Sequence, residues 1–342
     1  MKAIRMHEHG GPDVIHVDDV SAPEAPGPGE IKVNVRAMAL NHMDVWVRDG
    51  LPGIKQEMPF IMGCDAAGDV AEIGDGVEDL AIGDRVVLTP MVFCGKCAAC
   101  LSGEQSMCSS FQMRGEHVDG NFAEQVVIKA CAAQKITENV TFENAAAFCL
   151  TFLTAWRMLM TKARLLPGET VLIHGIGGGV ALAALTICNL VGARAVVTSS
   201  HDWKLDKAKE LGVAAGFNYK TQNVAKEVFK FTQRKGVDVV VDSVSGPAYN
   251  IGVKAAKPGG RIVVCGVTGG DASADLTRVF WKQLQVFGST MGNMKEFEEI
   301  IRLLNAGKLS PVVDRIYRAE QVRDAHEYLT SAQQFGKVVL TF

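Results

Sequence analysis

The sequence has no apolar run long enough to cross a bilayer. The longest, VALAALTICNLVGA at 180–193, is bounded by glycines, whereas a membrane helix needs roughly 20 apolar residues. The first ten residues, MKAIRMHEHG, lack the apolar core of a secretory signal. We therefore expect no membrane partner and a cytoplasmic location.

Long stretches of one charge are also missing. The chain carries 35 Lys and Arg against 38 Asp and Glu, a formal net charge of −3, and these charges are dispersed. No polybasic stretch suggests nucleic acid as a partner, so we expect a small-molecule substrate. Of the 342 residues, 48% are hydrophobic, which suffices for a substantial core and about two domains.

The cysteines are uneven in number and in placement. There are nine, and Cys94, Cys97, Cys100 and Cys108 fall within 15 positions. An odd count with one tight cluster argues against a disulfide scaffold and for thiols and metal. The spacing C-x2-C-x2-C-x7-C is typical of a closed tetrahedral zinc site, so we predict one structural Zn²⁺ per chain. An iron–sulfur cluster is the alternative.

The chain changes its pattern near Thr151. Before it, short strand patterns such as EIKVNVRAM alternate with Gly/Pro turns, which predicts a β-rich domain. After it, buried strand patterns such as TVLIHG and VDVVVDS alternate with helical patterns. That alternation predicts an α/β fold with a doubly wound parallel sheet.

The stretch HGIGGGVA at 174–181 follows a buried strand and opens an apolar helix. This is the context of a dinucleotide-binding turn, in which glycines let the backbone approach a pyrophosphate. The pattern departs from GxGxxG by one inserted residue and by Ala181 in place of the last glycine. A plain strand–helix turn is the alternative. The cofactor-binding residues expected here are Gly175, Gly177, Gly178, Gly179 and Val180.

The end of the next strand indicates which nicotinamide cofactor is bound. An NAD site normally places Asp or Glu there, whereas this strand ends in Thr-Ser-Ser-His at 198–201 and Asp202 already belongs to the following helix. Ser199 and Ser200, with the cation of Lys204, would accept the 2′-phosphate of NADP(H), which we favour over NAD. Alternatively, or in addition, the serines cap the following helix.

Several segments, taken in order, resemble the medium-chain dehydrogenase/reductase superfamily. They are the cysteine lobe, the glycine turn and the stretches MKA, NHMDVW, GCDAAG, GNFAEQVVI, LTAW, VDVVVDSVSG, GSTMG and GKVVL. The resemblance covers essentially the whole chain. It implies a GroES-like catalytic domain over 1–148 and 292–342, with a zinc lobe at 93–109, and a Rossmann domain over 149–291.

Zinc alcohol dehydrogenases of this superfamily hold a second, catalytic zinc with an early Cys, a GHE motif and a later Cys. At the corresponding positions this sequence has Asn41, Gly63-Cys64-Asp65 and Leu150, with Cys149 one residue away. The substitutions resemble the quinone-oxidoreductase-like branch, which reduces quinones or the activated C=C bond of enones and enoyl thioesters with NADPH. The resemblance therefore implies an NADPH-dependent reductase without a catalytic zinc.

Two other functions stay open at this point. A rearranged catalytic zinc site could use Cys64, Asp65 and Cys149, which would make the chain an alcohol dehydrogenase. Alternatively, the chain binds NADPH without catalysing a reaction, as some proteins of this superfamily do. Measurable turnover with a quinone or an enone would exclude the non-catalytic alternative.

The resemblance also assigns individual residues. Asn41 and Trp46 would contact the substrate, with the Asn41 amide as an oxyanion donor, and His42, Asp44 and Asp65 are candidate proton relays. The cofactor contacts implied beyond the glycine turn are Lys204 and Tyr219 at the 2′-phosphate, Val267, Ser289 and Gly292 at the nicotinamide, and Lys337 from the C-terminus. The strand LQVFGST at 284–290 is expected at a sheet edge, where pairing with its copy would form a homodimer.

Overall fold

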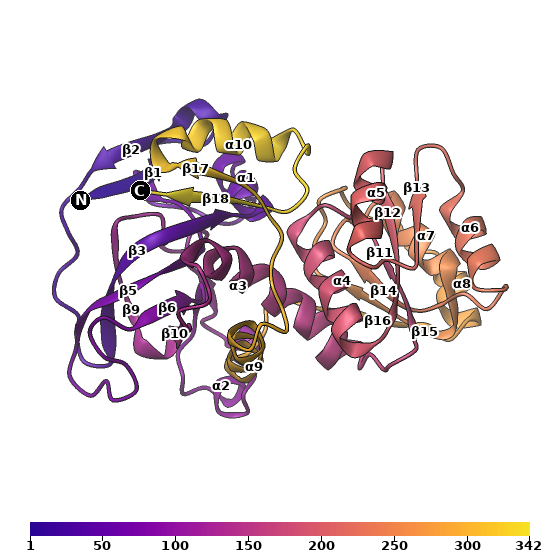
Figure 1. The fold of residues 1–342 in the computed structure, drawn as a ribbon, viewed down its shortest axis with the longest axis horizontal. Helices are drawn as coiled ribbons and strands as arrows, with labels where there is room; N and C mark the ends of the chain where they lie inside the picture. The colour runs from indigo at the N-terminus through magenta and orange to yellow at the C-terminus, as the bar shows by residue number, and fades with distance from the viewer. The chain divides into compact units, whose positions relative to one another are not determined.

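The computed structural model describes all 342 residues, which form two compact units (Figure 1). Unit 1 contains Met1–Leu150 and Asn293–Phe342, and unit 2 contains Thr151–Gly292. The chain thus leaves unit 1, builds unit 2 and returns. No helix is long and apolar enough to cross a membrane.

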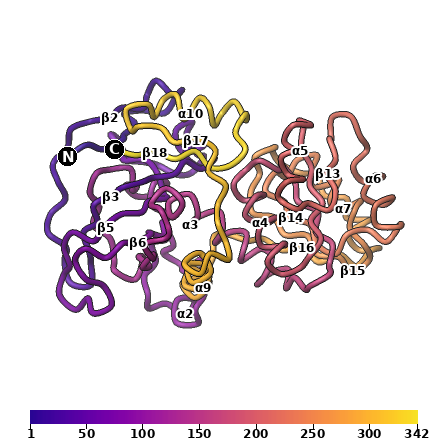
Figure 2. The backbone as a smooth tube through the Cα atoms, viewed as in Figure 1, coloured from indigo at the N-terminus to yellow at the C-terminus, as the bar shows by residue number.

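Unit 1 is built on a seven-stranded sheet in which β10, β6, β5, β3, β18 and β17 are neighbours in that order and β9 also pairs with β3. The strands are β3 (Glu30–Leu40), β5 (Asp65–Ile73), β6 (Arg85–Leu88), β9 (Gln125–Lys129), β10 (Ala133–Lys135), β17 (Val313–Arg318) and β18 (Lys337–Thr341). In Figure 2 the yellow C-terminal segment, β18, lies beside the indigo β3.

The pairing around β3 positions the candidate site. Asp65, the first residue of β5, pairs with Ala39 of β3, and Val338 of β18 pairs with Leu40. Both partner strands run antiparallel to β3, so each begins where β3 ends. The end of β3 and the starts of β5 and β18 therefore meet at one place.

Smaller elements complete unit 1. A three-stranded sheet contains β2 (Ile15–Asp19), β1 (Lys2–Met6) and β4 (Phe60–Ile61), and β7 (Met91–Val92) pairs with β8 (Gln112–Met113). The α-helices are α1 (His42–Asp49), α2 (Ala98–Leu101), α9 (Met294–Asn305) and α10 (Val322–Thr330), and α3 (Phe142–Trp156) contains the boundary between the units. The 3₁₀ turns are η1 (Pro12–Val14), η2 (Gln105–Met107), η3 (Ala130–Ala132) and η5 (Ala319–Gln321).

Unit 2 is a parallel six-stranded sheet in the order β13, β12, β11, β14, β15, β16. Its strands are β11 (Thr170–Ile173), β12 (Arg194–Ser199), β13 (Ala215–Asn218), β14 (Val237–Asp242), β15 (Ala256–Val264) and β16 (Gln285–Gly288). Its helices are α4 (Gly179–Val191), α5 (Asp202–Glu210), α6 (Val224–Phe231), α7 (Pro247–Ala255) and α8 (Leu276–Trp281), preceded by the π-helical turn η4 (Arg157–Lys162).

The sequence of β11 explains why this strand lies inside a parallel sheet. All four residues of β11, TVLI, are buried, as expected for a strand that is covered on both faces in a parallel sheet. The strand order reverses between β11 and β14, the point at which Rossmann folds bind dinucleotides. The predicted α/β fold with a doubly wound parallel sheet is confirmed, and β16 lies at the edge of the sheet as expected.

Candidate functional site

The predicted glycine turn lies in unit 2 between β11 and α4. Gly175 and Gly177 have φ of 71° and 108°, in the region that favours glycine. A Cβ atom on Gly175 would also lie 3.2 Å from the Val244 side chain. Gly178 is the N-cap of α4 and provides no side chain to cap the first N–H groups of the helix. The turn can therefore present backbone N–H groups to a phosphate at the positive end of α4.

The end of β12 lacks a carboxylate directed at this turn. Asp202 Oδ1 accepts a hydrogen bond from Asn218 Nδ2 at 2.7 Å, so the carboxylate is engaged with the neighbouring strand β13. The N-cap of α5 is His201, with no side-chain capping hydrogen bond. Ser200 Oγ instead lies 2.8 Å from His201 Nδ1. Ser199 Oγ accepts the His201 N–H at 3.1 Å, and neither serine is the N-cap residue of α5.

Four other predicted cofactor residues follow strands of the unit 2 sheet. Lys204 is 6% exposed, and its ammonium group lies 5.3 Å from the ring centre of Trp203. Tyr219, just after β13, is about half exposed. Ser289 directly follows β16, and Val267 lies shortly after β15. These residues all follow the carboxyl ends of parallel strands, where open α/β sheets bind their ligands.

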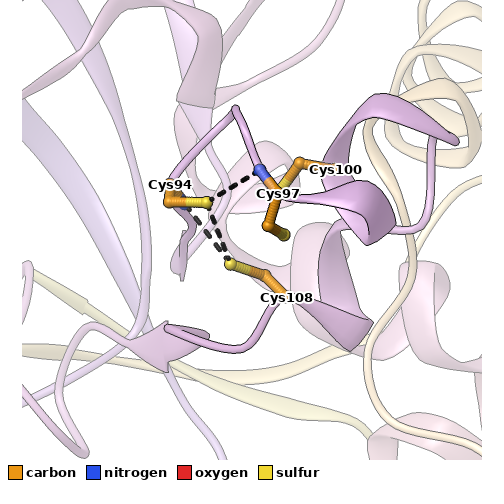
Figure 3. A group of neighbouring side chains, drawn as sticks. All are labelled: Cys94, Cys97, Cys100 and Cys108. Atoms are coloured by element: carbon orange, nitrogen blue, oxygen red, sulfur yellow. Dashed lines mark hydrogen bonds between the residues drawn. The ribbon is translucent and has the colours of Figure 1, made fainter.

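The four clustered cysteines come together in unit 1 (Figure 3). Cys94 precedes α2, Cys97 is its N-cap, Cys100 lies on it and Cys108 ends η2. Their four Sγ atoms all lie within 4.8 Å of one another, and those of Cys94 and Cys108 are 3.6 Å apart. Zinc–sulfur bonds of about 2.3 Å in a tetrahedron separate the sulfurs by about 3.8 Å. The arrangement fits a single Zn²⁺ ion.

The surroundings of the cysteines also suit a cation. The N–H of Cys97 donates to Cys94 Sγ at 3.3 Å, and the N–H of Ser110 donates to Cys108 Sγ at 3.4 Å. A hydrogen bond from the Cys100 N–H lowers the pKa of the Cys97 thiol to about 6, whereas burial raises the pKa of the Cys100 thiol to about 12. A bound Zn²⁺ ion would hold all four as thiolates. In an iron–sulfur cluster the cysteines bind different iron ions, so sulfurs this close favour one ion.

A second polar group, which we call the Asn41 cluster, consists of Asn41, Asp65 and Lys337. It lies where β3, β5 and β18 meet. Lys337 Nζ donates to Asn41 Oδ1 at 2.5 Å and to Asp65 Oδ2 at 3.2 Å, and Asn41 Nδ2 donates to Asp65 Oδ2 at 2.8 Å. Asp65 Oδ1 accepts from the Leu150 N–H at 3.1 Å. All three side chains are buried.

The Asn41 cluster differs from a metal site in its chemistry. Across the whole chain, the four-cysteine group is the only set of three or more His, Cys, Asp or Glu side chains whose ligand atoms lie close enough to share an ion. Cys64, Asp65 and Cys149 do not form such a set. Burial raises the pKa of the Cys64 and Cys149 thiols well above the ordinary value. The cation at this place is the ammonium group of Lys337.

The remaining predicted substrate-side residues, His42, Asp44 and Trp46, lie on α1. Asp44 Oδ2 accepts from the Asn41 N–H at 2.6 Å, while Asp44 Oδ1 is buried without a partner. Burial raises the pKa of Asp44 to about 7. The Trp46 ring packs edge-on against exposed His42, with ring centres 5.1 Å apart. Sequence reasoning expected Lys337 at the cofactor and missed its hydrogen bonds to Asn41 and Asp65, which depend on strand pairing.

Models of known families match both units. The alcohol dehydrogenase GroES-like domain matches residues 27–138, and the zinc-binding dehydrogenase family matches residues 179–306. Curated relatives include a zinc-type alcohol dehydrogenase-like protein of Leptosphaeria maculans, 32% identical over 95% of this chain and 94% of that protein. An alcohol dehydrogenase of Geobacillus stearothermophilus is 31% identical over 99% of both chains.

Solved structures agree with these matches. The chain is similar to an NAD-dependent alcohol dehydrogenase with 41% identity, complete coverage of both chains and a TM-score of 0.95. It is also similar to a cobalt- and zinc-bound thermostable alcohol dehydrogenase from Pyrobaculum aerophilum, at 29% identity and a TM-score of 0.89 over 100% of this chain and 99% of that one. With the two units, the glycine turn and the cysteine lobe in place, the chain belongs to the medium-chain dehydrogenase/reductase superfamily, in its zinc-type alcohol dehydrogenase-like branch.

Proposed function

We propose that this oxidoreductase is an NADPH-dependent reductase that transfers hydride to a quinone or to the activated C=C bond of an enone or enoyl substrate. It uses a structural zinc at the four cysteines and no catalytic zinc. The observation that carries the proposal is the Asn41 cluster. The positions that align with the ligands of a catalytic zinc hold Asn41, Cys64, Asp65 and Leu150. The Asn41 amide and the Asp65 carboxylate bind the ammonium group of Lys337, and the Leu150 N–H donates to Asp65.

The chemistry follows from this difference. A zinc ion acidifies a bound alcohol as a Lewis acid, and an ammonium group does not coordinate an alkoxide in that way. A bound reduced nicotinamide supplies the hydride, so the protein has to orient the acceptor and stabilise the charge that develops on its oxygen. Hydrogen-bond donors in a buried site meet that need.

The preference for NADPH is supported by the end of β12. The Asp202 carboxylate is engaged by Asn218, and Ser200 and Lys204 lie beside it in sequence where a 2′-phosphate would bind. A carboxylate at this place would accept a ribose hydroxyl and repel a phosphate. We therefore expect NADPH to bind more tightly than NADH.

Alcohol dehydrogenation is the second candidate, and the names of similar proteins favour it. Several are called alcohol dehydrogenases, and three of these are called NAD-dependent. The two candidates separate in one experiment. Zinc per chain is determined by elemental analysis, and the same protein is assayed with NADPH and NADH against quinones, enones and enoyl thioesters, and with NADP⁺ and NAD⁺ against alcohols. One zinc with reduction of a conjugated carbonyl supports the proposal; two zincs with alcohol oxidation overturn it. Binding of NADPH without turnover of any substrate would instead support a non-catalytic protein.

We also propose that the chain forms a homodimer through β16. This strand ends the sheet of unit 2, and Val286 on it and Trp281 on the preceding α8 are 44% and 80% exposed. Pairing with a second copy would satisfy the free edge of β16 and cover these apolar side chains. Light scattering of the purified chain should give twice the chain mass, and Val286→Asp should give the monomer mass. A monomeric parent chain would refute the dimer.

A further inference from the structure

We infer that Lys337 is the catalytic electrophile of the proposed reaction, and that its ammonium group binds the carbonyl oxygen of a conjugated acceptor. The inference rests on the proposed function and narrows its substrate class to acceptors that carry an oxygen conjugated to the carbon that receives the hydride. Enones, enoyl thioesters and quinones share this feature. Asn41 and Asp65 are then positioning residues that act through Lys337.

The hydrogen bonds of Lys337 leave it one donor. An ammonium group has three N–H bonds, and two of them point to Asn41 Oδ1 and Asp65 Oδ2. These two acceptors fix the position of Nζ, so the third N–H has a defined direction. In the ion pair, the side chain of Lys337 is 5% exposed and that of Asp65 is fully buried. The little exposure that the pair retains therefore belongs to Lys337.

Asn41, the oxyanion donor expected from the sequence, has no donor to spare. Its Nδ2 atom donates to Asp65 Oδ2 at 2.8 Å, and lies 3.3 Å from Cys64 Sγ and 3.4 Å from the Ala39 carbonyl oxygen. Its Oδ1 atom accepts from Lys337. A substrate oxygen at Asn41 would have to displace one of these partners. Lys337 would bind that oxygen without losing either of its own.

Asp65 is held in turn by the backbone. Its Oδ1 atom accepts the Leu150 N–H, and its Oδ2 atom accepts from Asn41 and Lys337. A carboxylate fixed on both oxygens keeps the cation in place. The Asn41 cluster thus resembles a preorganised donor site, in which the donor does not reorient when charge develops.

The electron count for an enone is as follows. Hydride, a proton with two electrons, forms a C–H bond at the β-carbon, and the nicotinamide is oxidised by two electrons. The π electrons of the C=C bond form the new double bond to the carbonyl carbon, and those of the C=O bond move to the oxygen. Lys337 donates a hydrogen bond to the resulting enolate oxygen. A proton from water then binds the α-carbon as the C=O bond re-forms, which completes the two-electron reduction of the substrate.

The test must separate catalysis from charge balance, because Lys337→Met leaves Asp65 buried without a cation. The double variant Lys337→Met/Asp65→Asn removes both charges. Lys32→Met is the matched control, since Lys32 is a buried lysine on β3 of the same sheet, 7% exposed, and pairs with Glu72 Oε1 at 2.8 Å. Single-turnover hydride transfer, the dissociation constant of NADPH and the melting temperature are measured for each variant.

We expect the double variant, saturated with NADPH, to transfer hydride about 100- to 1000-fold more slowly, as is usual when an oxyanion donor is removed. Lys32→Met should change the melting temperature and leave the rate near that of the parent. If Lys337 only balances Asp65, the double variant will recover the parental rate, and the inference is overturned while the proposed function stands.

A readout without turnover completes the test. 4-Nitrophenol, whose ionised form is coloured, serves as a mimic of the enolate and is titrated into the protein saturated with NADP⁺. We expect the parent protein to bind the phenolate and lower the apparent pKa of the phenol, and the double variant to lose this shift. An unshifted pKa in the parent protein overturns the inference. A shift in a protein that reduces no acceptor supports Lys337 as an oxyanion site and refutes the proposed function.

Discussion

Lys337 Nζ lies 2.5 Å from Asn41 Oδ1, although the two residues are 296 positions apart in the chain. The contact exists because β18 pairs with the end of β3, and the same pairing brings Lys337 to Asp65. A buried ion pair that loses one partner costs about 3–5 kcal/mol, because an uncompensated charge stays behind.

The first prediction concerns this pair. Asp65→Asn should lower the free energy of unfolding by several kcal/mol, since Lys337 loses its anion, and adding Lys337→Met should recover part of the loss. Urea unfolding of the parent, both single variants and the double variant measures the coupling. Strictly additive effects would show that the two charges do not stabilise one another.

Asp44 predicts a pH-dependent stability. Burial raises its pKa from 3.8 to about 7, so between these values the folded chain keeps a proton that the unfolded chain has lost. The free energy of unfolding therefore falls as the pH rises through this window. Asp44→Asn should be more stable than the parent, by about 2 kcal/mol more at pH 8 than at pH 5. Urea unfolding at both pH values is the measurement, with exposed Asp79→Asn as the control that should show no such difference.

The buried His326 predicts that the free energy of unfolding falls as the solution becomes more acidic. It is fully buried with both ring nitrogens unpartnered, and burial, with the charge of Arg48, lowers its pKa from 6.5 to about 3. The unfolded chain takes up a proton below pH 6.5 that the folded chain does not, so stability is lost as the pH falls from 6.5 towards 3. His326→Leu should gain about 2 kcal/mol at pH 5 relative to pH 8. An equal gain in the exposed control His16→Gln would contradict this explanation.

The zinc lobe should be structural. Cys97→Ser removes one of four ligands, so we expect zinc per chain to fall well below one and the melting temperature to drop by several degrees. Elemental analysis and thermal unfolding measure both effects. Iron in the parent protein, with a visible absorption band, would identify a cluster in place of zinc.

A substitution in the glycine turn should weaken NADPH binding and leave the stability of the fold nearly unchanged. A Cβ atom on Gly178 would meet nothing closer than 3.5 Å, so Gly178→Ala should fold with nearly the parental melting temperature. The added methyl group occupies the space through which a pyrophosphate approaches the backbone, and we expect NADPH affinity to fall at least tenfold. Gly192→Ala is the control at the other end of α4. Its φ of 81° strains an alanine, so this variant should lose stability and keep NADPH affinity. Both are measured by NADPH fluorescence titration and thermal unfolding.

Local patterns predicted most of the fold and the grouping of the four cysteines. Cys94, Cys97, Cys100 and Cys108 lie within 15 consecutive positions. Their close packing can therefore be predicted without knowing how the strands pair. The strand and glycine-turn patterns of unit 2 are likewise short-range. The partners of Asn41 were not predictable in this way. Whether Lys337 points to the cofactor or to Asp65 depends on the register of β18 against β3, which no local pattern encodes.

Other details were settled by burial and by individual hydrogen bonds. The sequence allowed Ser199 and Ser200 to cap the next helix, and the structure places His201 at the N-cap. Asp44 and His326 resemble ordinary polar residues on amphipathic helices. Their removal from water, and the resulting pKa shifts, follow from the packing of α1 and α10, which the sequence does not determine by itself.

The position of β18 has a consequence for the synthesis of the chain. This strand lies inside the sheet of unit 1, between β3 and β17, yet it consists of Lys337–Thr341 near the C-terminus. Unit 2 ends at Gly292 and so leaves the ribosome before unit 1 can be completed. Until β18 has been synthesised, residues 38–40 of β3 lack this partner strand on one side. The Rossmann unit can therefore mature on the nascent chain, whereas the Asn41 cluster forms only after Lys337 has been added to the chain.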